Sequence, residues 1–132
     1  MSTAAILDTH PSSATLDRAA LARAIDACLA CSQTCTACAD ACLAEPDVTE
    51  MARCIRDDLD CADVCQTTSR ILTRQTAGDP QLTRAVLEAC IQACSACAAS
   101  CGEHRDHHAH CRICADACEA CGQACRAVLH AL

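Results

Sequence analysis

The chain has 132 residues, of which seventeen are cysteine and none is Phe, Trp or Tyr, and its formal net charge is −7. This length suits a single domain with a modest core, and an acidic chain without a basic run or aromatic platform argues against nucleic-acid binding. The N-terminus lacks the basic region of a secretory signal, and no stretch approaches the ~18 uninterrupted apolar residues of a membrane span. We therefore expect a cytoplasmic protein with reduced thiols, and the odd cysteine count argues against a disulfide framework.

The chain is expected to divide into a flexible N-terminal tail over residues 1–14, where Pro11 is a loop signal, and one domain over 15–132. The first helix of that domain should begin near Thr15 or Leu16. The four expected helices cover about 15–44, 47–77 and 80–101, and a last stretch from the histidine-rich segment 103–110 to the C-terminus.

Proline, glycine and aspartate set the expected helix ends. Pro46 and Gly78 should stop the first two helices. Asp47 is followed three residues later by a glutamate, which predicts a capping box, and Asp79 before Pro80 predicts an N-cap with proline at the first helical position. Because short connections make consecutive helices antiparallel, the predicted fold class is all-α, an antiparallel up-down-up-down four-helix bundle.

Cysteines recur three and four residues apart in all four helices. With 3.6 residues per turn, such positions share one helix face, so the bundle should have a cysteine-lined core. One or two buried cysteines could simply replace small core hydrophobes, but matched faces on four helices indicate metal binding. The predicted ligands are Cys28, Cys31, Cys35, Cys38, Cys42, Cys54, Cys61, Cys65, Cys90, Cys94, Cys97, Cys101, Cys111, Cys114, Cys118, Cys121 and Cys125.

The two ends of the predicted bundle differ in composition. At one end, which we call the closed end, the faces continue with aliphatic residues: Leu21, Ile25, Leu72, Val86 or Leu87, Val128 or Leu129, and Leu132. At the other end, the mouth, they continue with Met51, His104 and His107, with His108 and His110 nearby. Thioether sulfur and imidazole nitrogen also bind soft metals, so Met51, His104, His107 and His108 join the candidate ligands. A solvated polar turn is the alternative explanation for the histidines.

The second helix interrupts its cysteine face between Cys54 and Cys61, where Asp57 or Asp58 takes the place of a thiol. An inward carboxylate could pair with a bound cation, or it could point outward beside the helix seam. The sequence leaves both arrangements open.

Spacing and charge favour Cu(I) over Zn(II). Residues three or four apart lie about 5–6 Å from each other at Cβ, which supplies pairs of thiolates along a helix, and groups of four only where two helices agree. Soft Cu(I) accepts two or three thiolates, whereas Zn(II) takes four in a tetrahedron. Each Cu(I) that replaces a thiol proton leaves the site neutral, but Zn(II) on four thiolates leaves two uncompensated charges in a dry core, which is costly.

Other metal and redox functions fit the sequence less well. Cysteine motifs for iron–sulfur clusters use short runs that are absent here. The Cys-x-x-Cys pairs lie inside helices rather than at an exposed helix start after a strand, which argues against thioredoxin-type catalysis and against an enzyme. The remaining alternative is a Zn(II)- or Cd(II)-binding detoxification protein with a metallothionein-like role.

The motifs C-x2-C-x3-C-x2-C-x3-C at 28–42 and 111–125, and C-x3-C-x2-C-x3-C at 90–101, resemble those of the cysteine-rich copper storage proteins, a four-helix-bundle family, in its cytosolic branch. The resemblance covers about residues 15–130. It implies storage and buffering of multiple Cu(I) ions on inward-facing cysteines, with His and Met at the open end. It also implies assembly as a homotetramer.

Overall fold

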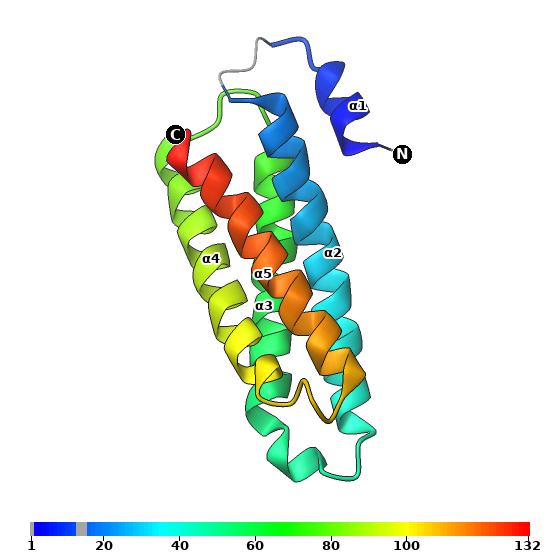
Figure 1. Ribbon diagram of the computed structural model, residues 1–132. Helices are drawn as coiled ribbons and strands as arrows, with labels where there is room; N and C mark the ends of the chain where they lie inside the picture. The colour runs from blue at the N-terminus through cyan, green and yellow to red at the C-terminus, as the bar shows by residue number, and fades with distance from the viewer. Residues whose placement is uncertain (1, 13–15) are drawn as a thin grey trace.

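Four long helices form the body of the protein (Figure 1). The computed structural model describes residues 2–12 and 16–132, and the helices it contains are α1 (Thr3–Asp8), α2 (Arg18–Leu43), a 3-10 turn η1 (Val48–Glu50), α3 (Ala52–Thr73), α4 (Pro80–Gly102) and α5 (Ala109–His130). Helix α2 packs against α3 and α5, and α4 packs against the same two helices. Short connections make consecutive helices antiparallel, so the predicted all-α, up-down-up-down bundle is confirmed.

Two of the helix starts follow the expected capping chemistry. The Asp79 carboxylate accepts a hydrogen bond from the Gln81 backbone N–H at 2.9 Å, and Pro80 opens α4, as predicted. The Asp17 carboxylate accepts from the Ala19 backbone N–H at 2.9 Å, so α2 begins at Arg18. Of the two expected starting positions, Leu16 lies just ahead of this cap, and Thr15 falls outside the described residues.

The predicted capping box at Asp47 is wrong. Its side chain caps no backbone N–H, because a 3-10 turn over Val48–Glu50 intervenes and Met51 occupies the N-cap position of α3. Helix α3 also ends at Thr73 rather than near Ala77. The Gln75 side chain donates to the Leu72 carbonyl at 2.8 Å, and Ala77 takes a left-handed conformation with φ of 52°. Side-chain chemistry near the turn therefore ends the helix before Gly78.

The segment expected to be a flexible tail contains the short helix α1, which differs from that expectation. The Ser2 hydroxyl caps it by accepting from the Ala5 N–H, and the helix-forming residues Thr-Ala-Ala-Ile-Leu-Asp follow. Leu7 is buried against the bundle, and the Thr3 hydroxyl donates to the Asp26 carboxylate on α2. Burial of Leu7 and this bond hold α1 alongside α2 (Figure 1).

The closed end is packed with aliphatic side chains, as expected. Those that are at most 3 % exposed are Leu21, Ile25, Leu72, Leu87 and Val128. The sequence left open whether Val86 or Leu87, and whether Val128 or Leu129, lies at the closed end. In the structure these residues are Leu87 and Val128. Leu132 does not join them, because it lies beyond the end of α5 and is 39 % exposed. Both chain termini and the α3–α4 connection lie toward this end (Figure 1).

Among the described residues, α4 is the one helix that is long and apolar enough to cross a membrane by length and composition. Its inner face carries Leu87 and four cysteines, all of which are buried in the bundle. This apolar composition is that of a core helix in a bundle.

Candidate metal centre

All seventeen cysteines point into the bundle. Each is a free thiol and is at most 2 % exposed, so the predicted cysteine-lined core is confirmed. Thiols from different helices meet across the axis: Cys28 and Cys125 lie 3.6 Å apart at Sγ, as do Cys35 and Cys118, and Cys65 lies 3.7 Å from Cys90. The helical period brings the thiols to one face of each helix, and antiparallel packing turns those faces toward one another.

The thiols form buried groups of four whose Sγ atoms all lie within 4.8 Å of one another. Five such groups are Cys28/Cys90/Cys121/Cys125, Cys31/Cys65/Cys94/Cys121, Cys31/Cys35/Cys61/Cys118, Cys35/Cys97/Cys114/Cys118 and Cys38/Cys42/Cys54/Cys111. Each group draws on three or four helices. Groups of four were expected only where two helices agree, whereas the structure brings thiols of three or four helices together in each group.

Neighbouring groups share members. Cys31, Cys35, Cys118 and Cys121 each belong to two of the five groups. A metal ion at one group therefore uses sulfur atoms that also face the next group along the axis. Such an arrangement suits bridging thiolates and a continuous series of ions better than isolated sites.

Burial keeps thiols near the mouth protonated in the absence of metal. Removal from water raises the pKa of the Cys111 thiol to about 11 and raises the pKa of Cys42 as well, since desolvation disfavours a thiolate. Hydrogen bonding from Cys101, whose Sγ lies 3.0 Å away, lowers the pKa of Cys54 instead. The thiols near the mouth therefore differ in how readily they ionise.

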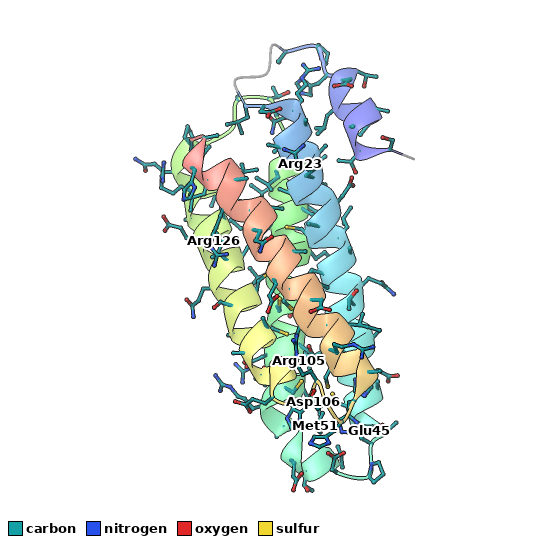
Figure 2. The ribbon with its side chains drawn as sticks, in the orientation of Figure 1. Arg23, Glu45, Met51, Arg105, Asp106 and Arg126 are labelled. Carbon is teal, nitrogen blue, oxygen red and sulfur yellow. The ribbon has the colours of Figure 1, made fainter. Side chains whose placement is uncertain are left out.

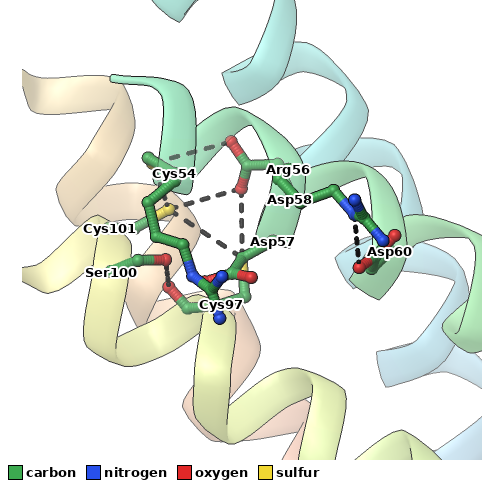
Figure 3. Close-up of polar contacts among 9 residues, drawn as sticks. Cys54, Arg56, Asp57, Asp58, Asp60, Cys97, Ser100 and Cys101 are labelled. Atoms are coloured by element: carbon green, nitrogen blue, oxygen red, sulfur yellow. Dashed lines mark hydrogen bonds and ion pairs between the residues drawn. The ribbon is translucent and has the colours of Figure 1, made fainter. Parts of the chain in front are cut away.

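Asp58 points into the core, which resolves the question left open by the sequence (Figure 3). Its Oδ1 atom accepts from the thiols of Cys114, Cys97 and Cys101 at 3.0, 3.1 and 3.3 Å. Burial raises the pKa of this carboxyl to about 8, and hydrogen bonding with Cys114 adds to the shift. Asp57 lies one position away around the helix and instead pairs with Arg53 at 3.2 Å. A carboxylate oxygen thus occupies the place of a missing thiol.

His110 is the imidazole that reaches the thiols, although the sequence placed it only near the mouth. Its Nδ1 atom lies 3.4 Å from Cys38 Sγ and 3.6 Å from Cys111 Sγ, and its Nε2 atom is buried without a partner among the described residues. A spacing signal existed, because His110 precedes Cys114 by four residues and so extends the cysteine face of α5 by one turn.

His108 ties the two connections at the mouth together. Its Nδ1 atom pairs with the Glu45 carboxylate, and its Nε2 atom lies 3.1 Å from Asp47 Oδ2. Hydrogen bonding to Asp47 raises the pKa of His108, and the same bond lowers the pKa of Asp47. The His108 ring also stacks on His110, with centroids 5.4 Å apart. Both of its ring nitrogens are therefore occupied by carboxylates.

The other mouth candidates differ in how closely they approach the thiols. Met51 is fully buried in the core, close to the η1 turn (Figure 2). His104 is half-buried, and its ring centroid lies 6.4 Å from that of His108. His107 is exposed, because the chain between α4 and α5 is not helical there and the spacing argument does not apply. The mouth is therefore lined by Met51, His104, His108 and His110, with His107 outside.

Comparison with known proteins gives a consistent picture. The sequence model of the family described as "Copper storage protein" matches residues 17–130. The chain belongs to this family. Its structure is similar to that of the copper storage protein Ccsp from Streptomyces lividans loaded with 10 copper equivalents, at 50 % identity and a TM-score of 0.97 over 98 % of this chain and 99 % of the other.

Two further relatives extend the comparison. A structure described as copper loading to a cytosolic copper storage protein from Streptomyces lividans (five coppers) is 54 % identical, with a TM-score of 0.85 over 86 % of this chain and 95 % of the other. The uncharacterized cysteine-rich protein YhjQ of Bacillus subtilis (strain 168) is 36 % identical over 104 residues, which cover 79 % of this chain and 91 % of the relative. The Csp family is one of copper storage proteins rather than of enzymes.

Proposed function

We propose that this protein stores and buffers many Cu(I) ions in the cytoplasm, with the seventeen core cysteines as thiolate ligands. The observation that carries the proposal is the overlap between the buried groups of four, in which Cys31, Cys35, Cys118 and Cys121 each serve two groups. Membership in the copper storage family and the copper-loaded state of the similar Streptomyces lividans protein support the choice of metal.

The charge of the core supports a high ratio of copper to cysteine. Burial raises the pKa of thiols such as Cys42 and Cys111, which are therefore neutral in the apo-protein, whereas hydrogen bonding from neighbouring thiols lowers the pKa of others, Cys54 among them. Each Cu(I) ion that displaces one proton leaves the core charge unchanged. Loading can therefore continue along the axis without accumulating the uncompensated charge that makes buried ions costly.

At the mouth we propose two metal ligands in addition to the cysteine sulfur atoms. His110 is placed to bind an ion held by Cys38 and Cys111 through Nδ1, and Asp58 to bind one held by Cys97, Cys101 and Cys114 through Oδ1.

The remaining predicted mouth residues have a role in loading. Met51, with a buried thioether, and the half-buried His104 would meet incoming ions before the core thiols do. His108 would do so only once a ring nitrogen leaves Glu45 or Asp47. His107 is exposed and would contact ions at the outer edge of the mouth. These four residues are proposed to set rates rather than capacity.

The alternative is a Zn(II)- or Cd(II)-binding detoxification protein, and the compact groups of four are an observation in its favour. Three groups without a common member can be chosen from the five, for example those that contain Cys28, Cys97 and Cys38. Three tetrahedral Zn(II) sites would then use twelve thiols, leaving two negative charges at each site. Competition between Zn(II) and Cu(I) for the reduced apo-protein separates the two functions. Copper storage predicts that Cu(I) displaces all bound Zn(II), whereas retention of Zn(II) under excess Cu(I) would favour the alternative.

We further propose that the protein has no catalytic activity and assembles as a homotetramer. The Cys-x-x-Cys pairs lie on buried helix faces, away from any exposed helix start. The outward aliphatic residues Leu59 and Ile113 are 46 % and 56 % exposed and provide surface for contacts between copies. Sedimentation equilibrium of the reduced apo-protein should give four times the 13.8 kDa chain mass; a monomer mass would contradict the tetramer.

A further inference from the structure

A groove of about 360 Å³ lies in the seam between α4 and α5, away from both ends of the bundle. Its walls are small residues: Ser95, Ala98 and Ala99 on α4 face Gly122 on α5. Cys94 and Cys118 lie at its floor. Of the five groups of four given above, Cys94 belongs to one and Cys118 to two, and all three include residues from the middle of the cysteine faces. We call the groove between these residues the side port.

The wall over the thiols is thin at Gly122. A Cβ atom at this position would lie 3.8 Å from the Cβ atom of Cys94 and 3.5 Å from Nη1 of Arg126. The Arg126 side chain and Cys94 are thus the contacts that a side chain at Gly122 would meet first. In the structure the port is shut, because Cys94 is 1 % and Cys118 0 % exposed. Movement of the exposed Arg126 side chain, seen at the α4–α5 side of the bundle in Figure 2, is the smallest change that would open it.

On the opposite side of the bundle, at the same level, a hydrogen bond closes the seam between α2 and α3. There the Ser32 hydroxyl of α2 donates to the Ala62 carbonyl of α3 at 3.0 Å, and Ala62 is buried. This bond closes the seam beside Cys31 and Cys61, whose Sγ atoms lie 3.9 Å apart. The two sides of the bundle thus provide two pairs of thiols for comparison. Cys94 and Cys118 lie under the groove, and Cys31 and Cys61 lie behind the α2–α3 seam that the Ser32 hydrogen bond closes.

The charges lining the side port identify a class of ligand. Glu119 and Arg126 both line it, and neither forms an ion pair within 4.0 Å among the described residues. A small thiol that carries both a carboxylate and an ammonium group can pair its carboxylate with Arg126 and its ammonium with Glu119. Its sulfur would then lie between these residues, above the floor of the groove.

We propose that the side port admits small zwitterionic thiols, which withdraw Cu(I) from the middle of the core without passing the mouth. The proposal rests on the copper-storage function above. In the exchange, a bond between Cu(I) and the incoming sulfur forms first, and the bonds between that ion and each core thiolate that holds it, Cys94 or Cys118 among them, then break in turn. The proton of the incoming thiol passes to the released cysteine, and copper remains Cu(I) throughout.

The port is tested first in the metal-free protein, so that the result does not depend on copper binding. Brief labelling of the reduced protein with iodoacetamide, kept well below one modification per chain, is followed by peptide mass spectrometry. We expect Cys94 and Cys118 to react about tenfold faster than Cys31 and Cys61, because the thinner wall opens more often. Equal labelling of the two pairs would overturn the proposal.

Variants sharpen this test. Gly122→Leu fills the groove with a good helix former and should slow labelling of Cys94 and Cys118 to the rate of Cys31, whereas Arg126→Ala should accelerate it. Ala127→Leu, at an exposed position of the same helix, is the matched control and should change neither rate. An unchanged Cys94 rate in a folded Gly122→Leu protein, verified by circular dichroism, would contradict the port.

Transfer of copper is then measured from the loaded protein to L-cysteine, to N-acetylcysteine, which lacks the ammonium group, and to cysteamine, which lacks the carboxylate. Gly122→Leu should slow transfer to L-cysteine about tenfold while leaving capacity unchanged, and Arg126→Ala should remove the preference for L-cysteine over cysteamine. Equal rates in wild type and Gly122→Leu would overturn the proposal. A low copper capacity in every variant would instead refute copper storage, with the labelling result still deciding the port.

Discussion

The two ends of the bundle are built on the same four helix faces but do different work. At the closed end the faces continue with Leu21, Leu72, Leu87 and Val128, which exclude water and hold the helices together. At the mouth they continue with Met51 and a group of histidines beside carboxylates. The difference predicts that stability depends mainly on the closed end and metal loading mainly on the mouth, with the thiols between them.

The largest expected effect concerns the thiols between the two ends. Replacing all five cysteines of α2, the set that includes Cys31 and Cys35, by alanine should reduce Cu(I) capacity by about five ions, because each thiol contributes to ions shared along the axis. Replacing the three cysteines of α3 by alanine is the matched comparison and should reduce the capacity by about three Cu(I) ions. Capacity is measured by titration against a chromophoric Cu(I) chelator; loss of the same number in both variants, or no loss, would contradict the account.

Substitution at the closed end should affect stability and not capacity. Leu87 is fully buried, so Leu87→Ala should lower the free energy of unfolding of the apo-protein by about 2–5 kcal/mol through lost burial and a residual cavity. Urea denaturation under reducing conditions measures this loss. If Leu87→Ala also lowers the number of bound Cu(I) ions in the folded protein, the two ends are not separated in function.

Asp58 predicts a pH dependence with a defined sign. Its pKa is about 8 in the folded chain against the ordinary 3.8, so the folded state holds a proton that the unfolded state has released. Stability should be fullest at acidic pH and fall as pH rises through neutrality, by about 3 kcal/mol between about pH 5 and about pH 7. Asp58→Asn removes this titration, and urea denaturation of both proteins at the two pH values measures the difference. If the free energy of unfolding of Asp58→Asn falls with rising pH as steeply as that of the wild type, the buried carboxyl does not titrate in this way.

The smallest effect is expected at the mouth. His110→Ala removes the ring nitrogen 3.4 Å from Cys38 Sγ and should slow Cu(I) loading severalfold with little change in final capacity. Removing Met51, His104, His107 and His108 together should likewise change rates more than capacity. Stopped-flow mixing with a Cu(I)–chelator complex measures loading, and His10→Ala, at the opposite end and bonded to Thr76, serves as the control. Loading rates equal to wild type would make the mouth histidines ordinary turn residues.

The regular parts of the molecule could be predicted from sequence because they follow from one period. Cysteines three and four residues apart, with Pro80 after Asp79 at a helix start, determine the helices and their inward faces. The groups of four could not be predicted, because they depend on the axial register between helices that are far apart in the chain. Asp58 and Asp57 are adjacent on α3, and only packing against α4 and α5 decides which carboxyl reaches the core thiols.

The irregular parts escaped prediction for local reasons. His107 has the right spacing from Cys111, but the helix begins only at Ala109, so the spacing has no structural meaning there. His110 lies inside the helix and reaches Cys38, a contact set by how α5 crosses α2. Helix α1 depends on burial of Leu7 against α2, which propensity alone does not reveal.

The most direct test of the central claim is a count of tightly bound ions. The reduced apo-protein would be titrated with Cu(I) under nitrogen in competition with a chromophoric chelator. Shared, low-coordinate thiolates predict a number near or above the seventeen cysteines of the chain. A plateau at about four or fewer ions would mean discrete tetrahedral sites that share no thiols, and would contradict copper storage.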